Sequence, residues 1–444
     1  MTTTSPASSR ARPAVPGRRA RRSRAKTIRR RRLVVALLVL VVLMTPIWWS
    51  LGSALTTRSM GTTVAARFAE WAHDHGGGSI VRWAENVWYS HHPPPKGGKP
   101  APGAIPSPTT TTAPAVTVGL PVPSPVVPLI SPALPGEGQW HPAGRTVNGT
   151  PAVYEAFVRP DPGSTSVVAG IAWMDTKLLR ATLYSGSSIP GGGPYKYSAP
   201  IQPTAATSLV AAFNAGFRMA TANSGYYTDG KVVIPLRTGA ASFVIYTNGS
   251  VAIGAWGSQV KMTSHVVSVR QNLDLVVTGG QPVPGLSSGT FLKWGATLGG
   301  AVDVWRSGIG ETANGALVYV GGPYLSIGTL ANLLVRAGAV RGMELDINTT
   351  WVNYATFSPT VPNGAATPTN GTDLLSNMAG SPGRYFASWW TRDFFTMSSA
   401  PTAHVTPPAT TIPSTQSAPS SSSGTSGASG ATASPAKGTT KRGS

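Results

Sequence analysis

The sequence predicts an α+β fold: a twisted, mostly antiparallel sheet with packed helices, preceded by one transmembrane helix and a juxtamembrane helical hairpin. Three observations lead to this prediction. Between residues 139 and 397 the apolar runs are short and rich in β-branched or aromatic residues. Turn-forming residues separate these runs. One long apolar run stands alone near the N-terminus.

Residues 1–32 are predicted to be a basic cytoplasmic arm. Residues 10–32 contain 11 Arg and one Lys, and so carry 12 of the positive charges behind the chain's net charge of +21. Because these charges lie on an arm and not on a folded face, we interpret them as an orientation signal that is attracted to anionic lipid. Binding of cytoplasmic nucleic acid by the arm is the weaker alternative, and no nucleic-acid partner is expected.

Residues 33–55 are predicted to cross the membrane. The run LVVALLVLVVLMTPIWW has no charge, and its helical length matches one bilayer core. Arginines on one side and Trp48-Trp49 on the other favour a cytoplasmic N-terminus and an extracytoplasmic main domain. The alternative is a cleaved signal peptide, although the apolar region is long for one and Gly52-Ser53-Ala54 is a weak cleavage site.

Four further segments follow. Residues 56–92 show two stretches of helical spacing around Gly76-Gly77-Gly78 and are predicted to be the juxtamembrane helical segment. Residues 93–138 are rich in Pro and Thr and are predicted to be an extended linker. Residues 139–397 form the folded domain, and residues 398–444 are predicted to be a disordered tail of Ser, Thr, Pro and Gly. The chain has no Cys, so the domain must be held by core burial alone.

Within the domain, Asn248-Gly249 predicts a hairpin between SFVIYT and SVAIGAW, and Asp229-Gly230 predicts another turn. Residues 329–338 (TLANLLVRAG) predict a helix that stops at Gly338, and residues 342–347 (GMELDI) predict the next strand. The other predicted strands are short runs rich in β-branched or aromatic residues: VVAGIAWM, LLRATLY, SLVAAFN, KVVIPL, LDLVV, AVDVW and ALVYV.

Candidate chemistry is found by elimination. Without Cys there is no thiol nucleophile and no Cys-ligated zinc, and the two His of the domain, His141 and His265, have no ligand spacing. No cofactor is predicted, and the sequence leaves a divalent metal open. Three acids, Asp303, Glu344 and Asp346, stand inside apolar strand runs, where an ionised carboxylate is costly unless it is paired.

Glu344 and Asp346 are two residues apart, so on a strand both side chains leave the same face. Two such carboxylates suit glycoside hydrolysis, where one acts as acid or base and the other as nucleophile. Equally, one could pair with an Arg while the other caps the following turn. Arg306 precedes Gly308 and Gly310, a pattern that suits phosphate binding beside exposed backbone. It also suits an ion pair with Asp303 or Asp346.

Three motifs resemble the phosphodiester glycosidase family. AAFNAGF (residues 211–217) resembles its A-x-N-G-G-F-F signature, RSGIG (306–310) resembles R-T-A-I-G, and the helix followed by GMELD resembles the segment that leads into L-x-L-D-G-G-G-S. The resemblance covers roughly residues 150–397. It implies an α+β fold with the site at strand ends, and removal of N-acetylglucosamine from a sugar phosphodiester.

Carried over residue by residue, the resemblance implies Asn214, Arg306 and Asp346 as site positions. Asp346 would be the acid/base or nucleophile, with Glu344 as its partner. Arg306, with Gly310 beside it, would hold the phosphate. Asn214 would hydrogen-bond the substrate. Asn348 lies where the chain departs from the family pattern, and we predict it as a further hydrogen-bond donor to the substrate.

The chain departs from the family pattern at two places. Ala215 replaces a glycine after Asn214, and Arg218 stands where a second Phe is usual. The glycines after the Asp are replaced by residues 347–350 (INTT), two of which are β-branched and resist positive φ. The loop is therefore expected to take another path.

Together these features predict a membrane-tethered extracytoplasmic hydrolase that acts on a phosphate-linked sugar of the cell envelope. The alternative is a catalytically silent domain of the same fold that binds envelope glycan or a partner. The expected partners are the membrane, through residues 33–55, and an envelope glycan or sugar phosphodiester.

Overall fold

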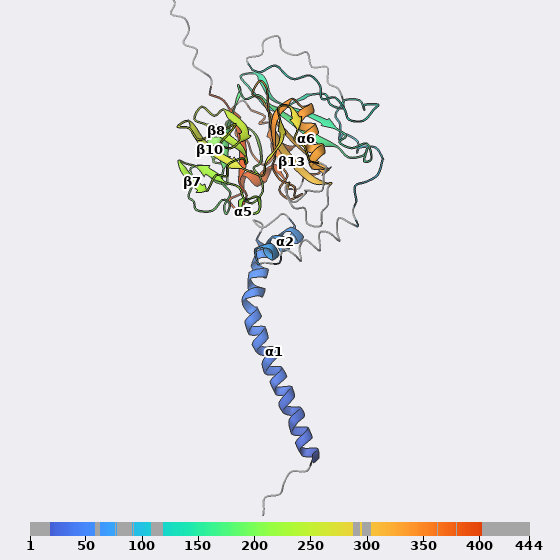
Figure 1. The fold of residues 1–444 in the computed structure, drawn as a ribbon, viewed down its shortest axis with the longest axis vertical. Helices are drawn as coiled ribbons and strands as arrows, with labels where there is room; N and C mark the ends of the chain where they lie inside the picture. The colour runs from blue at the N-terminus through green and yellow to red at the C-terminus, as the bar shows by residue number, and fades with distance from the viewer. Residues whose placement is uncertain are drawn as a thin grey trace, which may run out of the picture. The chain divides into compact units, whose positions relative to one another are not determined.

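A computed structural model describes residues 18–57, 63–75, 77, 91, 93–107, 119–286, 294, 303–361, 363–378 and 380–401. Helix α1 (Arg18–Thr56) is followed by α2 (Val64–Asp74) (Figure 1). The second half of the expected helical hairpin lies almost entirely outside the described residues, as do the first 17 residues of the basic arm and nearly all of the expected C-terminal tail.

Helix α1 contains one apolar stretch with the length and composition of a membrane span. It covers Arg29–Thr56, 28 residues, with a mean hydropathy of 2.4. A signal sequence near an N-terminus has the same length and composition. The helix therefore fits either a membrane anchor or a signal sequence. Helix α2 contacts the end of α1, because Arg67 Nη1 donates to the Leu55 carbonyl at 2.8 Å and Trp71 Nε1 donates to Ser50 Oγ at 3.0 Å.

The largest sheet has eight strands in the order β1-β2-β3-β14-β13-β15-β11-β12, each antiparallel to its neighbours. Its strands are β1 (His141–Val147), β2 (Thr150–Val158), β3 (Ala169–Met174), β11 (Leu275–Thr278), β12 (Gln281–Pro282), β13 (Val304–Thr312), β14 (Leu317–Leu325) and β15 (Ala339–Glu344).

Two five-stranded antiparallel sheets complete the described domain. One has the order β17-β16-β5-β18-β4, and the other β7-β6-β10-β8-β9. Their strands are β4 (Leu179–Tyr184), β5 (Leu209–Asn214), β16 (Tyr354–Phe357), β17 (Gly371–Asp373), β18 (Phe394–Ser399), β6 (Tyr226–Thr228), β7 (Lys231–Ile234), β8 (Ala241–Tyr246), β9 (Val251–Ala255) and β10 (Val266–Gln271). The predicted hairpins are confirmed: β8 and β9 pair around Asn248-Gly249, and β6 and β7 around Asp229-Gly230.

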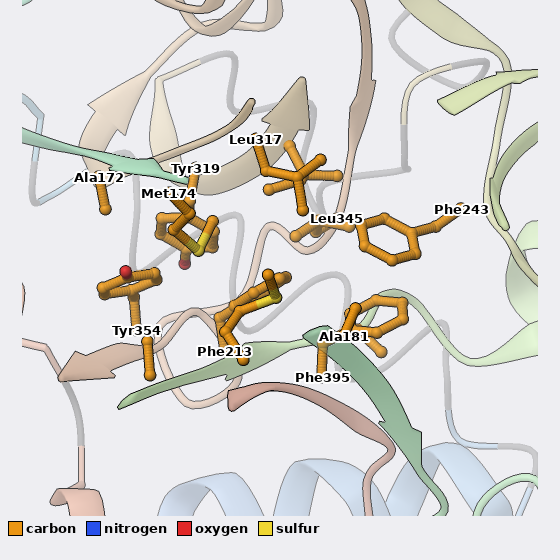
Figure 2. Packing of buried hydrophobic residues seen from close by; sticks show 14 of the residues in the cluster. Ala172, Met174, Ala181, Phe213, Phe243, Leu317, Tyr319, Leu345, Tyr354 and Phe395 are labelled. Atoms are coloured by element: carbon orange, nitrogen blue, oxygen red, sulfur yellow. The ribbon is translucent and has the colours of Figure 1, made fainter. Parts of the chain in front are cut away.

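The main core lies between the eight-stranded sheet and the β5-containing sheet (Figure 2). Tyr319 and Leu317 project from β14, and Phe213 and Phe395 project toward them from β5 and β18. Alternation along β14 explains the layering, because Val318 and Val320 point to the opposite face and belong to a second core. The central strands of the eight-stranded sheet are therefore buried on both faces.

Helix α6 (Ile327–Arg336) covers part of that second face, beside β13 (Figure 1). Ser326 caps it by accepting a hydrogen bond from the Thr329 backbone N–H at 3.0 Å. Leu330 and Leu334 of the helix pack over β13 and β15. This confirms the predicted helix and shifts its start by about two residues. The other short helices of the domain are α4 (Pro203–Ala206), α5 (Met219–Ala222) and the 3-10 helix η4 (Pro382–Phe386).

Part of the expected linker belongs to the packed domain. Leu120 and Val126 are buried in the second core, and the Leu120 backbone N–H donates to Asp175 Oδ2 at 2.6 Å. Glu137 forms a buried ion pair with Arg159, at 2.8 Å between Oε2 and Nη2. The expected boundary at residue 139 thus falls inside packed structure. A Pro-rich chain that also carries Leu and Val can cover a sheet in an extended form, without a helix or strand of its own.

Candidate functional site

A small pocket opens where β5 ends, β18 begins and the chain leaves β15. The side chains that line the pocket come from these strand ends and from the loops beside them. The residues are Asn214, Ala215, Gly216, Asp346, Trp351, Asn353, Arg384, Tyr385, Trp390, Arg392, Asp393 and Phe394. The space that a water-sized molecule can occupy among them is about 10 Å³, roughly enough for one water molecule. The pocket thus lies at strand ends, where the family resemblance also implied a site.

Asp346 stands two residues beyond the end of β15, and its carboxylate is held from both sides. Oδ1 accepts the backbone N–H groups of Ile347 at 2.8 Å and Asn348 at 3.0 Å. Oδ2 accepts from Arg392 Nη2 at 3.0 Å. The side chain is almost fully buried. These bonds all favour the ionised form of the Asp346 side chain.

Two arginines flank a pair of tryptophans in the pocket lining. The guanidinium of Arg392 lies 4.8 Å from the centre of the Trp351 ring, and that of Arg384 lies 4.7 Å from the Trp390 ring. The two indole rings contact one another, with centroids 5.2 Å apart. Cation–π contacts are strong where water is excluded, so the rings hold both guanidinium planes in fixed orientations.

A second carboxylate, that of Asp393, also lines the pocket. It forms a buried ion pair with Arg270, at 2.6 Å between Oδ2 and Nε. Arg270 also donates hydrogen bonds to the carbonyl oxygens of Phe217 and Gln271. Asp393 is therefore positioned as an anion whose charge is already balanced.

Asn214, which the resemblance implied as a site residue, is the last residue of β5 and lines the pocket. Its Oδ1 accepts from Tyr319 Oη at 3.0 Å and from the Asn353 backbone N–H at 3.1 Å. Its Nδ2 donates to Ser307 Oγ at 3.1 Å, and Ser307 accepts the Asp346 backbone N–H at 3.2 Å. Asn214 thus links the β5-containing sheet to the eight-stranded sheet and, through Ser307, to the backbone of Asp346.

Arg306 and Glu344 lie elsewhere. They form an ion pair with each other on the face of the eight-stranded sheet that α6 covers, and Arg306 Nε donates to the Leu325 carbonyl at 2.8 Å. Neither lines the pocket. Burial raises the pKa of Glu344 to about 7, against the lowering effect of Arg306. The ion-pair alternative for Arg306 is realised, with Glu344 as the partner and not Asp303 or Asp346.

The two remaining predicted positions also lie away from the pocket lining. Asn348 is exposed, and its Oδ1 accepts the Thr350 backbone N–H at 2.8 Å, which stabilises the turn after Asp346. Gly310 packs against the neighbouring strand β15: a Cβ there would lie 2.5 Å from the Ala339 Cβ and 3.4 Å from Leu334 Cδ2 of α6. Its lack of a side chain therefore serves the packing against Ala339 in this structure.

Sequence reasoning missed Arg384, Arg392, Trp351, Trp390 and Asp393. The segment 388–395 (SWWTRDFF) carried a usable signal, because it joins two Trp to an Arg-Asp pair in a chain with only 11% charged residues. Within the described residues, no three His, Asp or Glu side chains gather as a metal-binding group.

Comparison with known proteins finds no matching family model and no matching curated protein. Three solved structures show distant structural similarity. The zebrafish N-acetylglucosamine-1-phosphodiester alpha-N-acetylglucosaminidase catalytic domain, auto-inhibited by its pro-peptide, is 14% identical with a TM-score of 0.36, over 59% of this chain and 87% of that one. A hypothetical protein from Synechocystis is 13% identical with a TM-score of 0.31, over 58% and 64%.

A putative exported protein from Burkholderia pseudomallei is 11% identical with a TM-score of 0.22, over 54% of this chain and 75% of that one. Scores at this level carry no argument about chemistry, so the site has to be interpreted from its own geometry.

Proposed function

We propose that this chain is a membrane-tethered, extracytoplasmic phosphodiester glycosidase-like hydrolase that acts on a phosphate-linked sugar of the cell envelope. One observation carries the proposal. The pocket brings an ionised carboxylate, Asp346, together with two guanidinium groups, Arg384 and Arg392. These are the groups that hydrolysis of a sugar phosphodiester requires: a proton acceptor and cations for the phosphate.

The chemistry needs only one carboxylate in the pocket. The oxygen of water bonds to the anomeric carbon, and the bond from that carbon to the phosphate oxygen breaks with its electron pair left on the phosphate. A phosphomonoester is stable as an anion at neutral pH, because its second pKa is about 6. It therefore leaves without protonation, and Asp346 accepts the proton of the attacking water. Glu344, which lies outside the pocket, has no role in this step.

The test uses the full chain in detergent and the methyl phosphodiester of N-acetylglucosamine as probe. We expect release of N-acetylglucosamine and methyl phosphate, reduced about 100-fold or more by Asp346→Asn. Asp274→Asn is the matched control, because Asp274 is also paired with an arginine, Arg237 at 3.2 Å, but is partly exposed and outside the pocket. Equal release by wild type and Asp346→Asn would refute Asp346 as the proton acceptor.

A second candidate is binding without hydrolysis. It is favoured by the ion pairs of both pocket carboxylates, since Asp346 must give up part of its interaction with Arg392 before it can accept a proton. The same probe separates the two. Saturable binding with release at the background rate in wild type would identify a glycan-binding domain.

A further inference from the structure

Helix α2 carries an apolar face that is partly exposed. Its apolar residues stand at positions i, i+4, i+7 and i+8, the spacing that places side chains on one side of a helix: Val64, Phe68, Trp71 and Ala72. Ala72 is buried, but Val64 is 62% exposed and Phe68 is 46% exposed. A helix of 11 residues is marginal in water by itself, so the stability of α2 depends on what covers this face.

Two side chains of α2 hydrogen-bond to the last turns of α1. Trp71 Nε1 donates to Ser50 Oγ at 3.0 Å. Arg67 Nη1 donates to the Leu55 carbonyl at 2.8 Å. His75, just after α2, stacks on the Trp71 ring with centroids 4.6 Å apart, and its Nε2 lies 3.3 Å from the same Ser50 Oγ. These contacts fix α2 beside the C-terminal end of α1, so the depth of that end in a bilayer also sets the depth of α2.

The length of the apolar stretch in α1 gives that depth. Its 28 residues are about 42 Å long, whereas the hydrocarbon core of a bilayer is about 30 Å thick. Residues 29–32 are four arginines and belong at the headgroups of one side, so about 20 residues, 33–52, span the core. Ser50 and Leu55 therefore lie at the opposite boundary of the bilayer, whichever side the N-terminus occupies.

Aromatic side chains gather at this boundary. Trp48 and Trp49 of α1 are exposed, and Phe68 and Trp71 of α2 contact each other with ring centroids 6.2 Å apart. Aromatic residues are favoured at membrane surfaces, because an apolar ring with a polar edge suits the two sides of the headgroup layer. Within the described residues, α1 is the element that α2 packs against. The exposed part of the apolar face thus lies at the depth at which such side chains are most stable.

We propose that α2 is a second membrane contact, which lies in the headgroup layer and inserts Val64 and Phe68 at the boundary between headgroups and acyl chains. The partner is the surface of the same bilayer that α1 crosses. This inference rests on the membrane tether of the proposed function and is independent of hydrolysis. It adds to the span an interfacial helix that fixes the depth of α1 in the bilayer.

The first experiment measures the depth of α2 in the full chain, reconstituted into vesicles of phosphatidylcholine with one quarter phosphatidylglycerol. The chain has no Cys, so each single-cysteine variant accepts one spin label. Collisions of the label with oxygen, which concentrates in lipid, are compared with collisions with a water-soluble nickel complex. Leu40→Cys, within the span, is the lipid reference. Val232→Cys is the matched aqueous control, because Val232 of β7 is a valine with nearly the exposure of Val64, 58%.

We expect the label in Val64→Cys to favour oxygen, less strongly than in Leu40→Cys and in contrast to Val232→Cys. Two results in Val64→Cys would overturn the inference: a preference for nickel, which means that the face is in water, and little collision with either reagent, which means that it packs on protein. In both cases, a preference for oxygen in Leu40→Cys leaves the α1 anchor standing. A preference for nickel in Leu40→Cys would refute the anchor and, with it, this inference.

The second experiment removes the aromatic ring of Phe68. Phe68→Asn, added to Val64→Cys, should shift the preference of the label from oxygen toward nickel, because the apolar face loses its largest exposed side chain. Ala65→Asn is the matched control: it puts the same poor helix former into α2, at an exposed position outside the apolar pattern. Equal shifts in both would count against the inference. Because the label reports position without turnover, failure to hydrolyse the phosphodiester leaves this result standing.

Discussion

Glu155, on β2, shows at the scale of one residue how burial sets chemistry. It lies opposite His141 in the β1–β2 register, and its Oε1 has no hydrogen-bond partner among the described residues. Burial raises the pKa of Glu155 to about 8, against the lowering effect of a hydrogen bond from Thr356. The buried hydroxyl of Tyr354 lies close enough for Glu155 to act on its pKa. Glu155 is therefore mostly protonated in the folded protein at neutral pH.

This shift predicts how stability depends on pH. The folded-state pKa of about 8 exceeds the unfolded value of 4.5, so the contribution of Glu155 is complete below pH 4.5 and is lost as the pH rises through 8. Glu155→Gln cannot ionise. We expect it to match wild type near pH 5 and to be more stable by about 1–3 kcal/mol at pH 9. Urea unfolding at both pH values measures this, and a difference that does not change with pH would refute it.

The residues around Asp346 show why the proposed site was only partly visible in the sequence. Alternation placed Glu344 and Asp346 on one face, but β15 ends at Glu344. Glu344 stays on the face that α6 covers, whereas Asp346 turns into the pocket. Arg384 and Arg392 come from a segment about 40 residues later, and no periodicity in the sequence connects them to Asp346.

At the scale of elements, the loop after Asp346 replaces glycine geometry with side-chain hydrogen bonds. The resemblance implied three glycines, where this chain has Ile347-Asn348-Thr349. Asp346 and Asn348 accept backbone N–H groups within the loop, and none of residues 347–350 has positive φ. The loop therefore turns without the backbone conformations that favour glycine. Such Asx turns are short-range and could be anticipated from the sequence.

Two glycines of the α6 region should respond in opposite directions to the same substitution. Gly310→Ala puts a methyl group 2.5 Å from the Ala339 Cβ, and we expect a loss of about 1–3 kcal/mol. Gly328→Ala, in the first turn of α6, meets only Ser326 Oγ at 3.8 Å and should stabilise the fold by about 0.5–1 kcal/mol. Urea denaturation measures both changes, and a neutral Gly310→Ala would show that the contact between β13 and Ala339 of β15 can relax.

At the scale of the whole molecule, we propose a single-pass anchor with its N-terminus in the cytoplasm. The chain has no Cys, so single-cysteine variants report topology without background. In intact cells, a membrane-impermeant maleimide should label Ser258→Cys, at an exposed site in the domain, and should leave Ser9→Cys in the basic arm unlabelled. Labelling at position 9 would reverse the orientation. A mature chain that lacks residue 9 would identify a cleaved signal peptide.

The sequence by itself determined the features that depend on a few neighbouring residues, namely part of the strands, the helices and the turns. Short runs rich in β-branched residues located part of the strands, among them β3, β4, β5, β8, β9, β11 and β14, and periodicity located helix α6. Turn residues located the hairpins, and the length and composition of the apolar run marked α1. The tertiary structure alone decided which charges meet. It buried Arg306 with Glu344 and joined Asp346 to Arg392. The reason is physical: propensity and alternation act over a few residues, whereas ion pairing depends on which strand ends the sheets bring together.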